Sequence, residues 1–138
     1  MSHIMCSDGF GKFMEIITNC EVGLERLEDQ IGEALLHVQE ELHLGKAAMV
    51  MEVRPNMYQP HGRSICHDFF TYEKGYATEE FKIDYETSNK GVFHMIFHAE
   101  FGYAWNEEEK KAINTLSHAI YAAMRRARLK ELVDRAMM

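Results

Sequence analysis

The sequence contains few cysteines and no long apolar run, and these absences narrow the classes of protein to which it can belong. Its three cysteines, Cys6, Cys20 and Cys66, are widely spaced and form no CxxC pair. That pattern is typical of reduced thiols and argues against a disulfide framework or a cysteine-pair zinc site. No stretch approaches the roughly eighteen apolar residues of a membrane span, and the first residues lack the basic and apolar segments of a secretory signal. We therefore expect a cytoplasmic protein with no membrane partner.

The chain also lacks an excess of positive charge. Its formal net charge is −7 at pH 7, which argues against binding of nucleic acid as the main activity. The one basic cluster, between Arg125 and Lys130, is followed by Glu131 and Asp134, as on the solvated face of a helix. Dinucleotide-binding, P-loop, nucleophile-elbow and HExxH motifs are missing as well, which makes a stand-alone enzyme less expected.

Periodic apolar residues predict helices at both ends of what is most simply one domain of 138 residues. A short apolar run in residues 9–20 predicts one or two helical turns. Residues 21–44 carry apolar side chains at steps of three and four, which predicts an amphipathic helix that stops at Gly45. Residues 106–138 contain no glycine or proline and predict one helix on the order of 50 Å long, which exceeds the width of such a domain.

The middle of the sequence is β-patterned. Residues 46–55, 64–73, 79–86 and 92–102 predict strands, with a loop at 55–63, a turn or very short helix at 73–80 and a hairpin turn at 87–91. Short connections between consecutive strands favour an antiparallel sheet, with helices that are distant in sequence packed together on one of its faces. The predicted fold class is therefore α+β, with the C-terminal helix projecting.

Residues 91–129 resemble the end of a GAF domain. In that family the last hairpin strand leads to an aromatic residue, an acidic helix start, a regularly patterned helix and a connector. Here these elements fall on Gly91 to Phe97, Trp105, Glu107 to Glu109, and the helix through Leu129. The opening, residues 24–53, is similar to the amphipathic helix and strand with which a GAF domain begins. The last residues, RARLKELVDRAMM, further resemble the connector that precedes a GGDEF diguanylate cyclase domain.

The resemblance implies an N-terminal extension or short helix at 1–20, a GAF-like domain at 21–128, and the start of a connector helix at 129–138. It further implies a non-enzymatic sensory, regulatory and dimerisation domain of a bacterial signalling protein that controls cyclic-di-GMP synthesis. A small-molecule ligand would bind the sheet face or the 55–80 segment. That segment is shorter than in many GAF domains, and neither the chromophore-cysteine motif nor the NKFDE motif is evident, so no ligand identity is carried over.

Two groups of residues are candidates for these roles. The ligand-pocket candidates are strand residues with adaptable, aromatic or thiol side chains, for which core packing is the alternative: Met49, Met51, Cys66, Phe69, Phe93, Met95 and Phe97. The candidates for a dimer and coupling helix are the apolar residues of the last helix, whose apolar face shifts beyond Arg128 as if the helix changed partner from its own domain to a second chain: Leu116, Ile120, Met124, Leu129, Leu132 and Val133.

Histidines and cysteines were weighed as sites of other chemistry. His94 and His98 share a strand face but lie too far apart to bind one metal ion directly. His61 and the segment from Cys66 to Asp68 have suitable ligand types, but neighbouring strand residues point to opposite faces, so no metal or cofactor is expected. Two alternatives stay open: a pure dimerisation module with a vestigial pocket, and a small GAF-fold thiol redox enzyme that uses Cys66.

Overall fold

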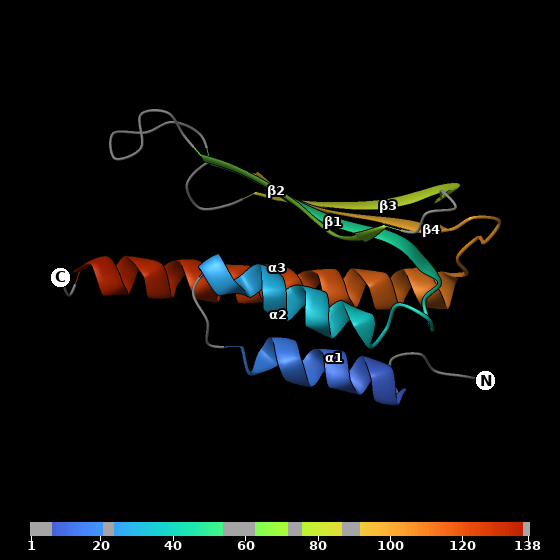
Figure 1. Cartoon of the computed structure of the whole chain (residues 1–138), viewed down its shortest axis with the longest axis horizontal. Coiled ribbons are helices and arrows are strands. Elements are labelled where there is room, and N and C mark those ends of the chain that lie inside the picture. The colour runs from blue at the N-terminus through green and yellow to red at the C-terminus, as the bar shows by residue number, and fades with distance from the viewer. Residues whose placement is uncertain (1–6, 21–23, 54–62, 72–75, 87–91, 137–138) are drawn as a thin grey trace. The chain divides into compact units, whose positions relative to one another are not determined.

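The protein has an α+β fold (Figure 1). The computed structural model describes residues 7–20, 24–53, 63–71, 76–86 and 92–136. Within them the elements follow in the order α1 (Asp8–Thr18), α2 (Leu24–Leu36), β1 (Leu44–Val53), β2 (Arg63–Thr71), β3 (Tyr76–Glu86), β4 (Val92–Glu100) and α3 (Glu107–Ala136). The chain divides into a helical unit, residues 1–42 and 106–138, and a sheet unit, residues 43–105.

Helix α1 is a regular helix that packs within the helical unit. It is 11 residues long, whereas the sequence predicted one or two turns. The Ser7 side chain caps it by accepting a hydrogen bond from the backbone N–H of Phe10 at 3.1 Å. Its apolar side chains, Phe10, Phe13 and Ile17, are buried, and α1 contacts both α2 and α3.

Helix α2 ends earlier than predicted. The sequence predicted a helix over 21–44 with Gly45 as its stop, but α2 ends at Leu36 and turns follow. Two backbone bonds span only three residues there, from His37 to Ala34 and from Val38 to Leu35, which tightens the end of the helix. The left-handed residue that redirects the chain is His43, with φ 50°. Val38 and Leu42 are buried although they lie in these turns, which is why the apolar period continued past the helix.

Gly45 has a different function from the one predicted. It lies in β1, between two pairs where the register with β4 shifts. A Cβ atom on Gly45 would come within 2.8 Å of the Ala99 carbonyl oxygen. The residue must therefore be small because two strands approach closely, and it does not end a helix.

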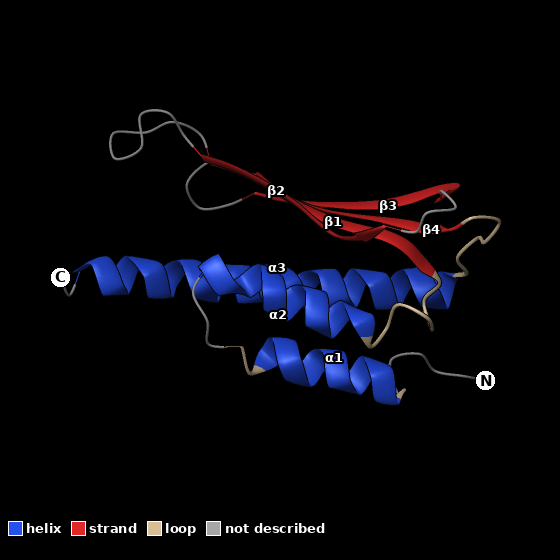
Figure 2. Ribbon diagram, in the orientation of Figure 1, coloured by secondary structure: helices blue, strands red, loops and turns tan. Residues whose placement is uncertain are grey.

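The four strands form one antiparallel sheet in the order β2-β1-β4-β3 (Figure 2). Burial alternates along the whole of β4, with Phe93, Met95, Phe97 and Ala99 buried, as predicted. Strand β3 begins at Tyr76, so much of the predicted turn at 73–80 is strand, and the 55–80 segment contributes β2 and the start of β3. The predicted loop at 55–63 and turn at 87–91 lie almost wholly outside the described residues.

Two glycines of α1 provide a matched test of helix packing. A Cβ on Gly9 would lie 2.3 Å from the carbonyl oxygen of His37, whereas a Cβ on Gly11 would meet nothing within 4 Å. We expect Gly9→Ala to lower the free energy of unfolding by about 1–3 kcal/mol, because α1 and the end of α2 must separate. Gly11→Ala should raise it by roughly 0.5–1 kcal/mol through helix propensity. Urea unfolding of both variants checks the pair; equal effects would contradict the close approach at Gly9.

Candidate functional site

Most of the ligand-pocket candidates form one row across the sheet. Met49 pairs with Met95, and Met51 pairs with Phe93; directly opposed residues of an antiparallel pair share a face. Met49 is 4% exposed, and Phe93, Met95 and Phe97 are each 0% exposed. These four side chains therefore fill a core. The side chain of Met51 lies outside the described part of the chain.

Cys66 and Phe69 do not belong to this row by register. Cys66 pairs with Val50, the neighbour of Met49, and the side chain of Cys66 lies outside the described part of the chain. The register shifts where Ala47 pairs with Phe70 and Ala48 with Asp68, so Phe69 is the extra residue of a bulge. The sequence alone does not reveal this register or the bulge. Cys66 and Phe69 were therefore predicted to line the same pocket as the other candidates.

Helix α3 contains two kinds of apolar residue. The first kind is buried within the single chain: Ala112, Ile113, Leu116, Ile120, Ala123, Met124 and Ala127. The second kind is exposed and begins immediately afterwards, with Leu129 at 60% and Val133 at 55%. Of the six dimer candidates, three are therefore core residues of one chain and two are open to a partner. The side chain of Leu132 lies outside the described residues.

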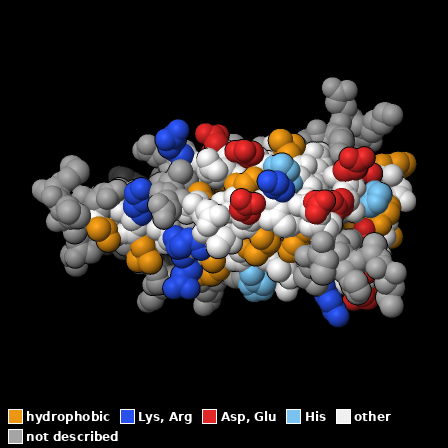
Figure 3. Space-filling model, turned by 90° about the horizontal axis from the view of Figure 1, so that it is seen from below, with side chains coloured by type: hydrophobic (Ala, Val, Ile, Leu, Met, Phe, Trp, Pro, Cys, Tyr) orange, Lys and Arg blue, Asp and Glu red, His pale blue; other side chains and the backbone are white. Residues whose placement is uncertain are grey.

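The basic cluster of α3 makes local contacts within the helical unit. Arg126 donates from its guanidinium to the carbonyl oxygen of Ile17 at 2.8 Å, which fastens α3 to the last turn of α1. Arg125 lies 5.9 Å from the ring centre of Tyr121, within the range of a cation–π contact. On the face shown in Figure 3, most basic side chains lie toward the C-terminal end of α3 and most acidic ones toward the other end.

The start of α3 is fixed by a capping box. The Asn106 side chain accepts from the N–H of Glu109 at 2.8 Å, and the Glu109 carboxylate accepts from the N–H of Asn106 at 3.0 Å. Glu109 is 3% exposed and Trp105 is 4% exposed. The acidic start that forms part of the family resemblance thus caps the first turn of the longest described helix.

A cluster that the sequence did not reveal lies at the end of the sheet unit. The His43 ring stacks on Tyr103 with centres 3.8 Å apart, and His43 Nδ1 lies 3.5 Å from a carboxylate oxygen of Glu100. The N–H of Glu100 also donates to the His43 carbonyl at 2.8 Å. His43 is the first residue of the sheet unit, and Tyr103 lies two residues before its end. The cluster therefore ties together the two points at which the chain enters and leaves this unit.

The described residues contain no metal site and no membrane helix. His94 and His98 are half-buried on the β4 face opposite Phe93 and Met95. Nowhere in the described ranges do three His, Cys, Asp or Glu residues gather as a metal site would require. His61 lies outside those ranges, as do the side chains from Cys66 to Asp68. Within the same part of the chain, no helix combines the length and apolar character needed to cross a membrane.

Comparison with protein-family models, with curated proteins and with solved structures finds no match to this chain. The functional proposal below therefore depends on the sequence resemblance and on three features of the structure. These are the α+β fold, the buried sheet row, and the change along α3 from buried to exposed apolar residues.

Proposed function

We propose that this chain is a non-enzymatic sensory and dimerisation domain of a cytoplasmic signalling protein, and that α3 couples it to a covalently linked output domain. By its resemblance to a GAF domain followed by a GGDEF connector, that output is a diguanylate cyclase. The observation that carries the proposal is the change along α3 from buried to exposed apolar side chains between Ala127 and Leu129.

The exposed residues support a helical partner in particular. Leu129 and Val133 are one helical turn apart, so they lie on the same face of α3. The exposed positions earlier on this face are mostly polar and include Lys111, His118 and Arg125. An apolar face that begins where the polar face stops favours pairing of two such helices, because two copies bury the same residues against each other.

Coupling requires that a signal distinguishes two arrangements of the paired helices. A ligand shifts an equilibrium only by the difference in its affinity for the two states. The capping box that starts α3 begins at Asn106, directly after the last residue of the sheet unit. The His43 cluster joins the two ends of that unit. These features give a short covalent route from a change in the sheet to the start of α3.

A pure dimerisation module is the second candidate, and the burial of the sheet row favours it. Phe93, Met95 and Phe97 are fully buried in the free chain, so a ligand could not contact them without opening the core. In this candidate α3 pairs as before, but the sheet binds nothing.

The residues of the interface are tested by placing a charge on each exposed apolar position. Leu129→Glu and Val133→Glu should each weaken self-association roughly 100-fold or more, because an uncompensated carboxylate would be buried between the helices. The matched control is Leu36→Glu at the end of α2, since Leu36 is also 62% exposed but lies on another element. Analytical ultracentrifugation over a range of concentrations measures the effect. Equal weakening in all three variants would show that α3 is not the specific interface.

A further inference from the structure

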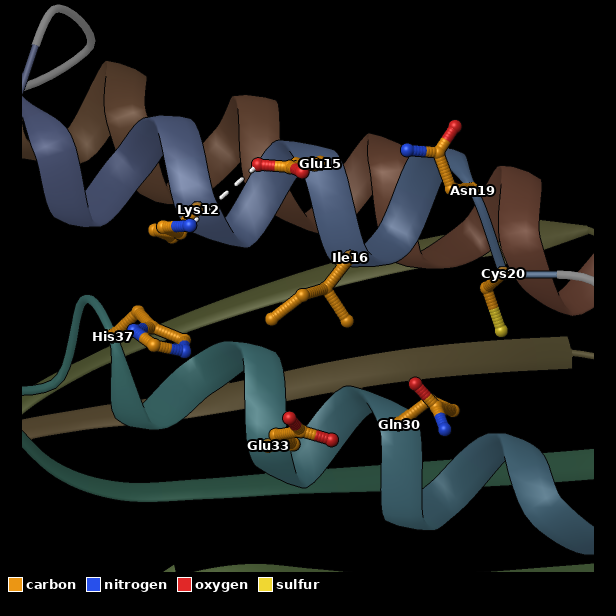
Figure 4. A pocket seen from close by; sticks show the side chains of 8 residues that line it. All are labelled: Lys12, Glu15, Ile16, Asn19, Cys20, Gln30, Glu33 and His37. Atoms are coloured by element: carbon orange, nitrogen blue, oxygen red, sulfur yellow. Dashed lines mark ion pairs between the residues drawn. The ribbon is translucent and has the colours of Figure 1, made fainter.

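A groove between α1 and α2 lies within the helical unit and has no part in the proposed dimer (Figure 4). Its volume is about 530 Å³, within the roughly 300–1,000 Å³ of small-molecule sites. Gly9 of α1 lies close to the turn after α2, because a Cβ atom on Gly9 would lie 2.3 Å from the His37 carbonyl oxygen. The groove begins one turn further along α1, and its lining residues are Lys12, Glu15, Ile16, Asn19, Cys20, Gln30, Glu33 and His37.

The lining groups are ordered along the groove. Lys12 of α1 and His37 of the turn after α2 lie at the same end, and Cys20 and Gln30 lie at the other end (Figure 4). Between them are the carboxylates of Glu15 and Glu33, with the Ile16 side chain directed from α1 toward α2. A ligand along the groove would thus meet nitrogen groups first, then carboxylates around an apolar floor, and finally an amide and a thiol.

This order selects the class of ligand. A simple anion at Lys12 would face the negative charges of Glu15 and Glu33, and a simple cation at these carboxylates would face Lys12. A small zwitterion suits both kinds of charge. Its negative and positive groups are separate, so each can lie beside the groove residues of opposite charge. Within the described residues, the one ion pair of Lys12 is with Glu15, at 4.0 Å between side chains 63% and 64% exposed. Exposed pairs of this kind are weak, so Lys12 can exchange this partner for a ligand.

We propose that the groove binds a free α-amino acid with a polar, uncharged side chain. The carboxylate of the ligand lies at Lys12 and His37, its ammonium group lies between Glu15 and Glu33, and its side chain passes over Ile16 toward Gln30. An amide side chain fits this end because Gln30 offers both a donor and an acceptor. This proposal rests on the proposed sensory function and names the class of ligand that is sensed. The site lies within the helical unit of one chain, so ligand binding does not require the dimer.

The test is titration calorimetry of the full chain with L-glutamine and two analogues, L-glutaminamide, which lacks the carboxylate, and N-acetyl-L-glutamine, which lacks the ammonium group. Lys12→Met should weaken glutamine binding about tenfold, the effect of one hydrogen bond to a charged group, and leave glutaminamide binding unchanged. Glu33→Gln should weaken the binding of glutamine and of glutaminamide and leave the binding of N-acetylglutamine unchanged. The matched controls, Lys111→Met and Glu40→Gln, remove the same charges at exposed positions outside the groove and should change nothing.

Two results would overturn the proposal. One is the absence of saturable heat with glutamine; the other is equal weakening of glutamine and glutaminamide by Lys12→Met, which would show that no carboxylate is recognised there. The mass of the same protein distinguishes this failure from failure of the proposed function. Specific binding by a chain that stays monomeric supports the groove and contradicts the dimer, whereas a dimer without binding does the reverse.

Discussion

Phe97→Ala is expected to lower the free energy of unfolding by about 3–5 kcal/mol, the usual cost of removing a fully buried phenylalanine side chain. Phe97 is 0% exposed on β4, a central strand of the sheet that pairs with both β1 and β3. Its partner on β1 is Ala47, a small residue that cannot fill the space left behind. Urea unfolding followed by circular dichroism measures the loss.

The size of this effect decides between a core and an open ligand pocket. A side chain that lines an open pocket already contacts water, so its removal costs little stability. The control is Ile96→Ala, because Ile96 is the neighbouring residue on β4 and is only half-buried. We expect its cost to be clearly smaller than that of Phe97→Ala. If the two substitutions cost the same small amount, Phe97 is not a core residue and the sheet row regains its role as a binding surface.

Ile120→Ala should lower the free energy of unfolding by about 2–5 kcal/mol, and by the same amount at every protein concentration. Ile120 is 0% exposed within a single chain, on a helix that contacts both α1 and α2. Its packing is therefore lost whether or not a second chain is present. Thermal unfolding at two concentrations tenfold or more apart measures both properties.

Leu129→Ala is the matched variant on the same helix. Leu129 is 60% exposed, so its removal should cost the isolated chain roughly 0.5 kcal/mol or less. Any larger effect should grow with protein concentration, because the stability that a partner adds depends on mass action. A concentration-dependent loss for Ile120→Ala, or a large concentration-independent loss for Leu129→Ala, would contradict the division of α3 into a core part and an interface part.

The sequence predicted the regular elements wherever a single apolar period persisted. The alternation of Phe93, Met95 and Phe97 predicted β4, and the absence of glycine and proline predicted α3. The end of α2 could not be predicted in this way, because Val38 and Leu42 keep a helical spacing while the backbone has already turned. Gly45 was misinterpreted as a helix stop, since its small size serves a close approach to Ala99 that involves a distant part of the chain.

The candidate site was less predictable than the fold. The cluster of His43, Glu100 and Tyr103 forms only because segments that are far apart in sequence come together. The groove between α1 and α2 depends on how these two segments pack against each other. Local patterns carry none of this information. The shift of apolar face after Arg128 was visible in the sequence because it lies within one helix.

The most direct test of the account is the mass of the purified chain by light scattering, measured beside a chain that ends at Arg128. The shorter chain keeps the buried residues of α3 and loses Leu129 and Val133. We expect a dimer for the full chain and a monomer for the shorter one, because the exposed apolar face of α3 holds the two copies together. A monomer in both cases, or a dimer in both, would contradict it.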